Sequence, residues 1–513
     1  MRCWPSTLGS GGIDMQAWDA IRKAVEGERE RFIQSTRMTA QVQEQVLQGI
    51  LHRHRGSRFG REHDFAFIGD SRQYAHQVPL TEYRQTRPWI EAMLKGDRQA
   101  LIADWSHFET TGGSDGGAKI IPYGASGMRG FQKALYPWLD DLLQQRPAIG
   151  KGSAYWSISP VLRSDRTAES VPLGLKNDAL YFGPELAGNI SKTLAVPATA
   201  GEFSELLPWQ TYTLKHLLQA QDLRMISVWS PTFLLQLMKA LGNSERWLTD
   251  SLPSRIRQRL GDALKTGTLD TTVLWPELDT LSCWTQGPAQ VFVPALRQLF
   301  PQAHIQGKGL LATEGVVSVP VEGAQDPVLA VNSGYFEFVD NAGKVLQAAE
   351  VQPGERYRII LTNDLGMYRY DLGDEVEISG WYEQAPMLRF RGRISTSDLV
   401  GEKLEEVFVA RVLESVDGFS LLCAVSESQP GYVLLSETSE SDAARIEKGL
   451  FRNPQYAYAR KMGQLAPLAI RQVAGLDELY SRWRLQQGQQ LGDIKPVYLL
   501  RDDSFLQFLE SSR

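Results

Sequence analysis

The stretch from Phe108 to Tyr123, FETTGGSDGGAKIIPY, places four glycines, three hydroxyl residues and one lysine within ten positions, from Thr110 to Lys119. Glycine permits backbone conformations with positive φ and lets N–H groups approach an anion, while the hydroxyl and ammonium groups add further donors. Strand-like Ile120-Ile121-Pro122 follows at once. The pattern predicts a phosphate-binding loop that leads into an extended segment, and the alternative is a flexible surface loop.

The spacing of this loop separates it from two common nucleotide motifs. A Walker A loop requires Gly-Lys-Ser/Thr in succession, whereas Lys119 lies between Ala118 and Ile120. A dinucleotide fingerprint is also missing from this stretch. The order of residues is similar instead to the loop of enzymes that join a carboxylic acid to AMP, with Thr110, Thr111, Gly112, Gly113, Ser114, Gly116 and Lys119 at the matching positions.

Composition limits the partners of the chain. Over 513 residues the formal net charge is −6, and no basic block resembles a nucleic-acid-binding arm, so nucleic acid is not expected as a partner. No run approaches the ~20 apolar residues of a membrane span, and no signal peptide is recognisable, so we expect a cytoplasmic protein without membrane contact. The three cysteines lie far apart and fit a reducing compartment. Residues 1–14 are predicted to be a disordered extension.

Apolar periodicity predicts an α/β fold. Helices are expected over residues 16–51 and 72–103, and one long helix over 125–146. A strand at 225–229, an N-cap at Ser230 and Pro231 at the first helical position form a β-to-α unit. Trp229 and Phe233 of this unit could line an acyl pocket or simply fill the core. The basic segment with His52, His54 and His63 is interpreted as solvated surface rather than a metal site.

Two further motifs are ambiguous when taken alone. Residues 307–312, GKGLLA, satisfy G-x-G-x-x-A, but the strand-like residues 316–321 follow where a dinucleotide site needs a helix. Alternatively, Thr313 contacts a nucleotide phosphate and Glu314 holds Mg²⁺, an ion that takes one or two protein oxygens. Gly373 and Asp374 are predicted to form a turn between two strands, and Asp374 is a suitable acceptor for two ribose hydroxyls.

The pattern of short strands over residues 327–393 predicts a small barrel or a mixed sheet. We therefore expect a large N-terminal domain over 15–393, a hinge at 394–398 and a smaller mobile α+β domain over 399–513. In the smaller domain, helices are predicted at 404–414, 441–452 and 475–487, and strands at 418–427, 430–438 and 497–500. Lys495 lies in a loop before the last of these strands.

The order of these motifs resembles the acyl-adenylate-forming superfamily. Within it the chain resembles bacterial members of the acyl acid amido synthetases, the auxin-responsive Gretchen Hagen family, over about residues 16–500. The matching text is ISVWSPTFLLQLMKAL, LRQLFPQAHIQGKGLLATEG, YRYDLGDEVEISGWYEQAPMLRFRGR and GEKLEEVFV. This resemblance implies a firefly-luciferase-like architecture, in which residues 15–393 form the adenylation domain and residues 399–513 the lid.

The resemblance also implies a function and a set of site residues. The chain would use ATP and Mg²⁺ to adenylate a carboxylic acid and then transfer the acyl group to the amine of an amino acid, acting as a monomer. Residues Thr110 to Lys119 would hold the phosphates, with Thr313, Asp374 and Arg393 also at the nucleotide. Catalytic roles would fall to Lys119, to Glu314 as the metal ligand, to Lys403 at the α-phosphate and to Lys495 from the C-terminal domain.

Three positions depart from the family pattern. Gly113 replaces a Thr or Ser of the loop, Leu310 stands where an adenine-stacking Tyr is usual, and Lys495 is followed by Pro-Val-Tyr. Two alternatives therefore remain beside the amido synthetase. One is an acyl-CoA or carrier-protein ligase that uses the same adenylate, and the other is a nucleotide-binding protein without enzymatic activity.

Overall fold

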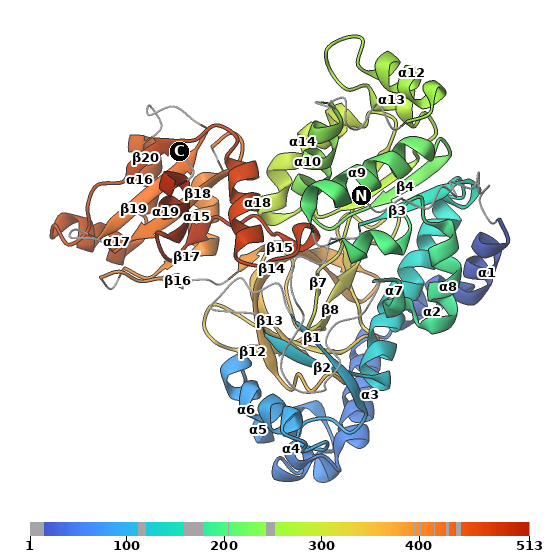
Figure 1. Ribbon diagram of the computed structural model, residues 1–513. Coiled ribbons are helices and arrows are strands. Elements are labelled where there is room, and N and C mark those ends of the chain that lie inside the picture. Colours follow the sequence, from blue (N-terminus) through green and yellow to red (C-terminus); the bar gives the residue numbers. More distant parts are fainter. Residues whose placement is uncertain are drawn as a thin grey trace.

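The computed structural model describes residues 15–110, 119–157, 178–203, 205–242, 252–393, 396–400, 402–414, 416–426, 430–437 and 443–511. Figure 1 shows an antiparallel sheet at the centre, the helices of residues 39–94 below it, a parallel sheet with its helices above, and the C-terminal region on the left. The predicted α/β class is confirmed by this arrangement. Among the described residues no helix is both long and apolar enough to cross a membrane.

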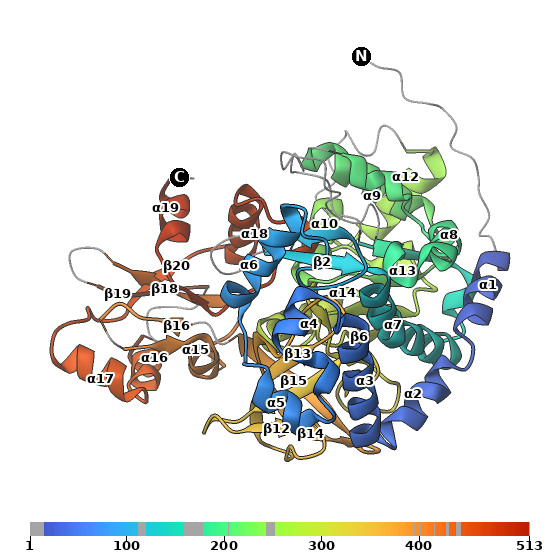
Figure 2. The ribbon, with the colours of Figure 1, turned by 90° about the horizontal axis from the view of Figure 1, so that it is seen from below.

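The N-terminal segment forms helices as the apolar spacing predicts. Trp18, Ile21 and Val25 give α1 a buried stripe, because residues three and four apart share one face of a helix. Figure 2 shows α3, α4 and α5 lying across the antiparallel sheet. The elements are α1 (Met15–Val25), α2 (Glu28–Thr36), α3 (Thr39–His54), α4 (Arg58–Glu62), η1 (Phe65–Phe67), α5 (Ser71–Gln77) and α6 (Tyr83–Leu94).

One histidine of this segment departs from the expected solvated surface. His54 is only 1% exposed, and its Nε2 lies 2.9 Å from Asp364 Oδ1. Arg53 forms two further hydrogen bonds to the same carboxylate, each of 2.8 Å. The end of α3 therefore docks on the loop before β14, a tertiary contact that local sequence spacing does not reveal.

A parallel four-stranded sheet forms the upper lobe, with the order β3-β4-β5-β6. Its strands are β3 (Ser153–Trp156), β4 (Leu223–Ser227), β5 (Thr280–Cys283) and β6 (His304–Gly307). The helices before and between them are α7 (Ala125–Gln145), η2 (Ile149–Lys151), η3 (Asp178–Phe182), α8 (Pro184–Thr193), η4 (Ala198–Glu202), α9 (Leu206–Gln219), α10 (Pro231–Gly242), α12 (Ser254–Ala263), α13 (Thr271–Leu274), η5 (Gly287–Phe292) and α14 (Val293–Leu299). The predicted long helix and β-to-α unit are confirmed.

The central sheet has seven strands in the order β12-β11-β13-β14-β15-β10-β9, and every pairing in it is antiparallel. Its strands are β9 (Ser318–Val319), β10 (Val328–Leu329), β11 (Tyr335–Val339), β12 (Val345–Gln347), β13 (Arg356–Thr362), β14 (Tyr370–Tyr382) and β15 (Ala385–Arg393). The strand expected over 316–321 is divided between β9 and β8 (Gly315–Val316), which pairs with β7 (Leu311–Ala312).

Gly373 and Asp374 do not form the predicted turn between two strands. Both lie inside the continuous strand β14, at a bulge where Ile360 pairs with Asp371 but Arg358 pairs with Glu375. Gly373 has φ +70°, a left-handed conformation that favours glycine. The bulge changes the direction of the strand where Asp374 follows.

The C-terminal region, called the lid below, folds around the sheet β20-β19-β18-β21. Its elements are β16 (Thr396–Ser397), β17 (Leu404–Glu405), α15 (Glu406–Leu413), β18 (Ser420–Val425), β19 (Gly431–Ser436), α16 (Ala443–Leu450), α17 (Pro454–Lys461), β20 (Ala469–Gln472), α18 (Leu476–Gln486), η7 (Leu491–Asp493), β21 (Leu499–Leu500) and α19 (Ser504–Ser511). Of these, β16, β17, α17, β20, η7 and α19 were not predicted, and the helix expected from residue 404 begins at Glu406. The domain boundaries and the hinge at 394–398 stay predictions.

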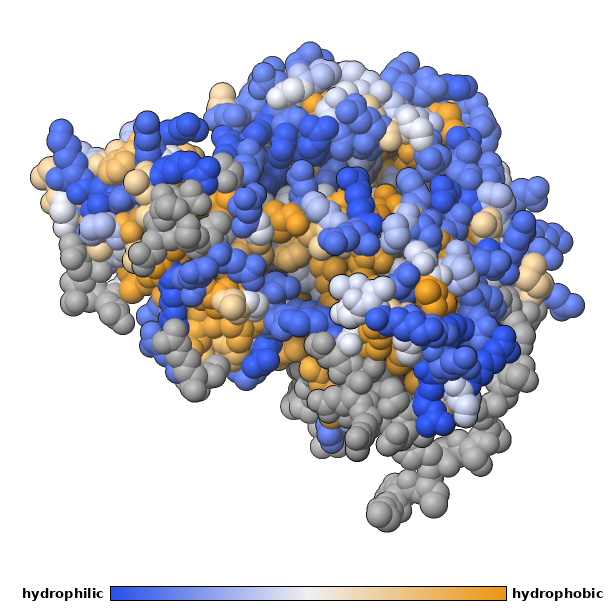
Figure 3. All heavy atoms as spheres, turned by 90° about the horizontal axis from the view of Figure 1, so that it is seen from above, coloured by the Kyte–Doolittle hydropathy of each residue, from blue (hydrophilic) through white to orange (hydrophobic). Residues whose placement is uncertain are grey.

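One hydrophobic cluster joins the lid to the parallel lobe. Phe419 of the lid lies 5.7 Å from Phe292, ring to ring, and both belong to a core that also contains Trp209 and Trp483. Gln236 of α10 donates a 2.9 Å hydrogen bond to Ser481 of α18. Figure 3 shows a mostly hydrophilic face on which hydrophobic residues gather toward the middle. The lid therefore packs on the large domain through apolar contact.

Candidate active site

The strands β1 (Trp105–Thr110) and β2 (Ile120–Gly124) position Lys119. Their antiparallel register pairs Thr110, the last residue of β1, with Ile120, the first residue of β2. Lys119 immediately precedes this pair. Lys119 Nζ donates a 3.0 Å hydrogen bond to Tyr370 Oη and lies 3.5 Å from Glu314 Oε1. The lysine predicted to hold phosphate therefore points toward the predicted metal ligand.

Glu314 occupies the tight turn between β7 and β8. Its backbone is fixed from two sides, because Asn363 Nδ2 donates to Glu314 O at 2.7 Å and Tyr123 Oη donates to the neighbouring Thr313 O at 2.5 Å. Gly315, which follows, has φ +154°, and a Cβ there would lie 2.8 Å from Asn363 Nδ2. The Glu314 side chain is buried, so its position is set by packing rather than by solvent.

Asp374 enters the same region from the bulge in β14. It is 2% exposed, and its Oδ1 lies 3.2 Å from Arg393 Nε on the neighbouring strand β15. That oxygen nevertheless has no hydrogen-bond partner among the described residues. A buried carboxylate oxygen of this kind is available to accept a hydrogen bond from a donor outside the described residues.

Lys495 reaches the site from the lid. Its Nζ lies 5.1 Å from the centre of the Trp284 ring, a distance at which an ammonium is attracted to an indole face. The Lys495 backbone is held by a 3.2 Å hydrogen bond from Tyr480 Oη to Lys495 O. Lid and large domain therefore both contribute cations to one site.

Burial dominates the electrostatics of the site. It raises the pKa of Asp374, while the positive charges of Arg393 and Lys495 oppose that rise. Burial likewise lowers the pKa of Lys495, and the charge of Arg393 lowers it further, whereas Asp374, Glu314 and Asp493 favour the protonated ammonium. The pKa of Asp493 itself is raised to about 6, because the carboxyl is buried.

The structure brings Lys119, Glu314, Asp374, Arg393 and Lys495 together. Thr110 lies exposed at the end of β1, and Thr111, Gly112, Gly113, Ser114 and Gly116 fall outside the described residues. Lys403 is exposed on the lid, in a left-handed conformation with φ +45°, and contacts none of these five residues in the described part of the chain. The roles of the individual residues stay predictions.

Several polar residues of the site were not predicted. Tyr370 bonds to Lys119, Tyr83 Oη accepts a 2.8 Å hydrogen bond from Ile120 N, and Asn363 and Tyr123 fix the Thr313-Glu314 turn. Tyr370 could have been found from its position in YRYDLGD, four residues before Asp374 on one strand. The other three come from distant segments, and nothing local to their sequence indicates this contact.

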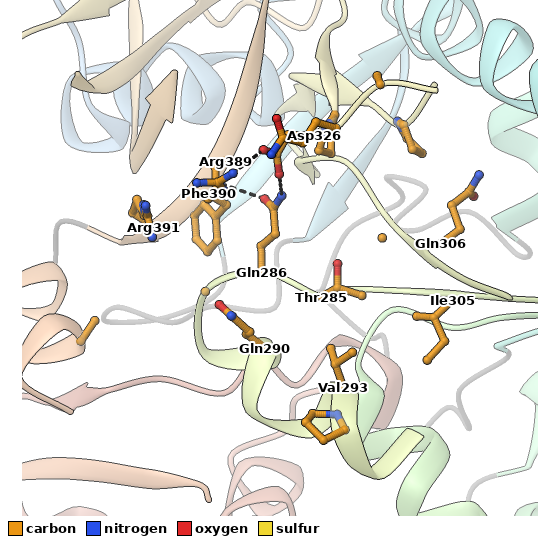
Figure 4. A pocket seen from close by; sticks show the side chains of 18 of the residues that line it. Thr285, Gln286, Gln290, Val293, Ile305, Gln306, Asp326, Arg389, Phe390 and Arg391 are labelled. Carbon is orange, nitrogen blue, oxygen red and sulfur yellow. Dashed lines mark hydrogen bonds and ion pairs between the residues drawn. The ribbon is translucent and has the colours of Figure 1, made fainter. Parts of the chain in front are cut away.

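Two cavities adjoin the site. A cavity of about 220 Å³ is lined by Trp284, Lys308, Leu310, Arg393 and Lys495 among others. A larger one, of about 730 Å³, lies between the large domain and α15. The wall common to both includes Gln286, which in Figure 4 lies between Phe390 and Asp326. Gln286 donates to Asp326 Oδ1 at 2.9 Å and accepts from Phe390 N at 2.8 Å.

Comparison with solved structures identifies the fold. The chain superimposes on the GH3.15 acyl acid amido synthetase with a TM-score of 0.78 at 18% identity, covering 93% of this chain and 94% of that one. A second structure, AtGH3.15 acyl acid amido synthetase in complex with 2,4-DB, gives a TM-score of 0.79 over 98% and 97%. The fold is thus that of an acyl acid amido synthetase.

Sequence comparison gives the family. The model of the GH3 family N-terminal domain matches residues 28–256, and that of the GH3 family central domain matches residues 327–393, together more than half of the chain. The chain belongs to the GH3 family, as the motifs predict.

Two curated relatives in this family share low sequence identity with this chain but align with most of its length. A probable indole-3-acetic acid-amido synthetase from Oryza sativa subsp. japonica is 23% identical over 86% of this chain and 80% of its own length. Jasmonoyl–L-amino acid synthetase JAR6 from Nicotiana attenuata is 22% identical over 89% and 90%. A second rice amido synthetase reaches 32% identity, but only over 29% of this chain and 33% of its own length.

Proposed function

We propose that this protein is an ATP-dependent acyl acid amido synthetase, which adenylates a carboxylic acid and transfers the acyl group to the amine of an amino acid. The observation that carries the proposal is the convergence of five charged side chains on one place. They come from the residue before β2, the β7–β8 turn, β14, β15 and the lid, and are Lys119, Glu314, Asp374, Arg393 and Lys495. The family relatives carry the names of amido synthetases, which supports the same conclusion.

A nucleotide fits the donors and acceptors of this site. The buried Oδ1 of Asp374 has no described hydrogen-bond partner, as an acceptor reserved for ribose hydroxyls would. Lys119 and Arg393 would lie along the phosphates, where fixed cations lower the cost of bringing a carboxylate to a polyanion. Leu310 borders the 220 Å³ cavity and would pack against the base in place of a stacked tyrosine.

The residues also fit Mg²⁺. Glu314 offers one buried carboxylate, and Mg²⁺ is often held by one or two carboxylates together with substrate phosphates and water. When bound, the ion would neutralise phosphate charge. Lys119, 3.5 Å from Glu314, would orient that carboxylate when no ion is present.

The proposed reaction has two steps. In the first, a carboxylate oxygen of the acid attacks the α-phosphorus of ATP, and pyrophosphate leaves with the bonding electron pair. Lys495 would stabilise the charge that builds up on the α-phosphate. In the second, the amine attacks the acyl carbon, AMP leaves, and the amine loses a proton. We assign no general base for that proton.

The acceptor amine would approach through the larger cavity. That cavity is lined by Arg297, Arg356, Arg389, Arg391 and Arg411, and it meets the smaller cavity at Thr285, Gln286 and Phe390. Guanidinium groups suit the α-carboxylate of an amino acid because they can bind a carboxylate through two parallel hydrogen bonds. Mutual repulsion with Arg411 and Arg391 contributes, after burial, to the lowered pKa of Arg356.

The decisive experiment measures acid-dependent exchange between ATP and pyrophosphate over a panel of aryl and alkyl acids, followed by mass spectrometry of products formed with amino acids. We expect exchange with acid alone and an amide only when an amine is added. An acyl-CoA product instead of an amide would indicate the thiol ligase. Failure of the protein to bind ATP with Mg²⁺ in calorimetry would indicate a protein without enzymatic activity.

The cellular setting is also a proposal. Cys283 and Cys423 are buried free thiols, which suits a reducing compartment such as the cytosol. We propose that the protein acts there as a monomer.

A further inference from the structure

The carboxyl ends of β4, β5 and β6 carry a row of large side chains. Trp229, Trp284 and Lys308 follow these strands, and backbone hydrogen bonds keep them aligned, from Trp284 N to Trp229 O at 2.9 Å and from Lys308 N to Cys283 O at 2.8 Å. In open α/β sheets, ligands bind beyond the carboxyl ends of the strands. This row therefore lies where such a sheet would hold a small molecule.

Lys308 is held in this row by aromatic faces and a hydroxyl. Its Nζ donates a 2.8 Å hydrogen bond to Ser227 Oγ and lies 4.9 Å from the Trp229 ring centre and 5.4 Å from that of Trp138. The Trp138 indole is itself fixed, because its Nε1 donates to Gln306 Oε1 at 3.0 Å. These contacts order a long and flexible side chain before any ligand arrives.

The same cavity connects Lys308 with the proposed catalytic lysine. Lys308 and Lys495 both line the 220 Å³ cavity. Lys308 lies over Trp229 and Lys495 over Trp284, and the two indole rings are 6.0 Å apart, tilted by 37°. Each ammonium group therefore lies beside one indole of this pair.

The charges around this cavity favour an anionic occupant. Its lining contains the cations Lys308, Arg393, Arg484, Lys495 and Arg501, against the carboxylates Glu406 and Asp502. Arg393 and Lys495 are needed for the nucleotide and the reacting carboxylate in the proposed function. Lys308 lies beside Trp229 and has no role assigned to it in that function.

We propose that Lys308 is a specificity-determining residue for the acid substrate, an inference that rests on the proposed function. The acid belongs to a class with a flat apolar body and a second anionic group. Its reacting carboxylate lies toward Lys495, its body against Trp284, and its second anion at Lys308, all of which line the 220 Å³ cavity. A lysine ammonium can form a charge-assisted hydrogen bond with such an anion.

The test uses pairs of acids that differ only in the second anion: benzoate and terephthalate, phenylacetate and 4-carboxyphenylacetate, hexanoate and adipate. The rate of ATP–pyrophosphate exchange is measured for each acid with the wild type, Lys308→Met and Lys308→Arg. We expect the wild type to prefer the dianion of at least one aromatic pair. In Lys308→Met that preference should fall about tenfold or more, the loss of one charge-assisted hydrogen bond, whereas Lys308→Arg should keep most of it.

Controls separate specificity from folding. Lys23→Met removes an exposed lysine on α1 and should leave the preference unchanged, and thermal unfolding of both methionine variants checks that they fold. A wild-type preference for the monoanions, or a Lys308→Met variant that slows both members of each pair equally, would overturn the role of Lys308 alone. Absence of exchange with every acid would overturn the proposed function and this inference with it.

Discussion

Asp374 and Lys495 illustrate how burial controls the chemistry of single residues here. Burial shifts the pKa of each residue in the direction that favours its neutral form, and the charge of the other residue opposes that shift. Perturbed titrating groups that face one cavity are typical of functional sites. Substituting Asp374 or Lys495 should therefore remove that residue's own contacts and also change the pKa of the other residue.

Lys495→Met tests the contribution of the lid to the first step. We expect it to slow acid-dependent ATP–pyrophosphate exchange by about 100-fold or more, as the loss of one preorganised donor to developing charge does in other enzymes. ATP binding should weaken far less. Lys448→Met, an exposed lysine on α16, is the matched control in the lid. Exchange within threefold of wild type would remove Lys495 from the mechanism.

Asp493→Asn tests the charge network through pH. The Asp493 carboxylate favours the protonated form of Lys495, so removing it should lower the pKa of Lys495 further. Exchange requires the ammonium, so its decline at alkaline pH should begin at lower pH in the variant. Because the pKa of Asp493 is about 6, the wild-type carboxyl is neutral well below that pH, and the two pH profiles should converge there. Profiles that coincide at high pH would contradict this coupling.

At the scale of elements, most helices and strands follow from periodicity, but their contacts do not. The proximity of Lys119, Glu314 and Asp374 could be predicted because each belongs to a motif with a chemical requirement, whereas most of the Thr110–Lys119 loop lies outside the described residues. The bulge at Gly373 was mistaken for a turn because a left-handed glycine suits both. The contacts of His54, Asn363 and Tyr123 could not be predicted, since their partners lie 310, 49 and 190 residues away in the chain.

One buried ion pair joins the N-terminal helices to the central sheet. Arg369 donates to both oxygens of Glu337 on β11, at 2.8 and 2.9 Å, and its Nη1 also donates to the carbonyl oxygens of Ala75 and Val78 at the end of α5. Both side chains are at most 5% exposed. The pair has no recognisable signature in the sequence.

Glu337→Ala should destabilise the protein by about 3–5 kcal/mol, because it leaves a buried guanidinium without its counter-charge. Urea unfolding followed by fluorescence measures this. Glu383→Ala is the matched control, because it breaks the exposed Arg37–Glu383 pair, whose side chains are 49% and 42% exposed, and should cost less than about 1 kcal/mol. Equal losses of unfolding free energy in Glu337→Ala and Glu383→Ala would show that burial does not determine how much an ion pair contributes to stability.

At the scale of the molecule, the lid presents Lys495 to the site while Lys403 remains exposed on its surface. A role for Lys403 at the α-phosphate would thus require the lid to turn after the first step. Such a reorientation is compatible with lids that complete a site in one position and admit a second substrate in another.

Lys403→Ala should therefore slow amide formation about tenfold or more while changing ATP–pyrophosphate exchange less than twofold. Single-turnover amide formation from preformed acyl-AMP isolates the second step. Lys461→Ala, at the end of α17 and exposed, serves as the control. An equal loss in both assays would place Lys403 in the first step, and no loss in either would exclude it from the reaction.

The apolar contact between Phe419 of the lid and Phe292 of the parallel lobe should make lid attachment depend on temperature. Separating the lid from the parallel lobe would expose aromatic surface to water, and such exposure has a large positive heat-capacity change. Attraction of this kind weakens on cooling. At low temperature the lid should therefore detach from the parallel lobe more readily. If lid detachment limits turnover at higher temperature, the chemical step would become rate-limiting at low temperature. An Arrhenius plot of amide synthesis should then be curved.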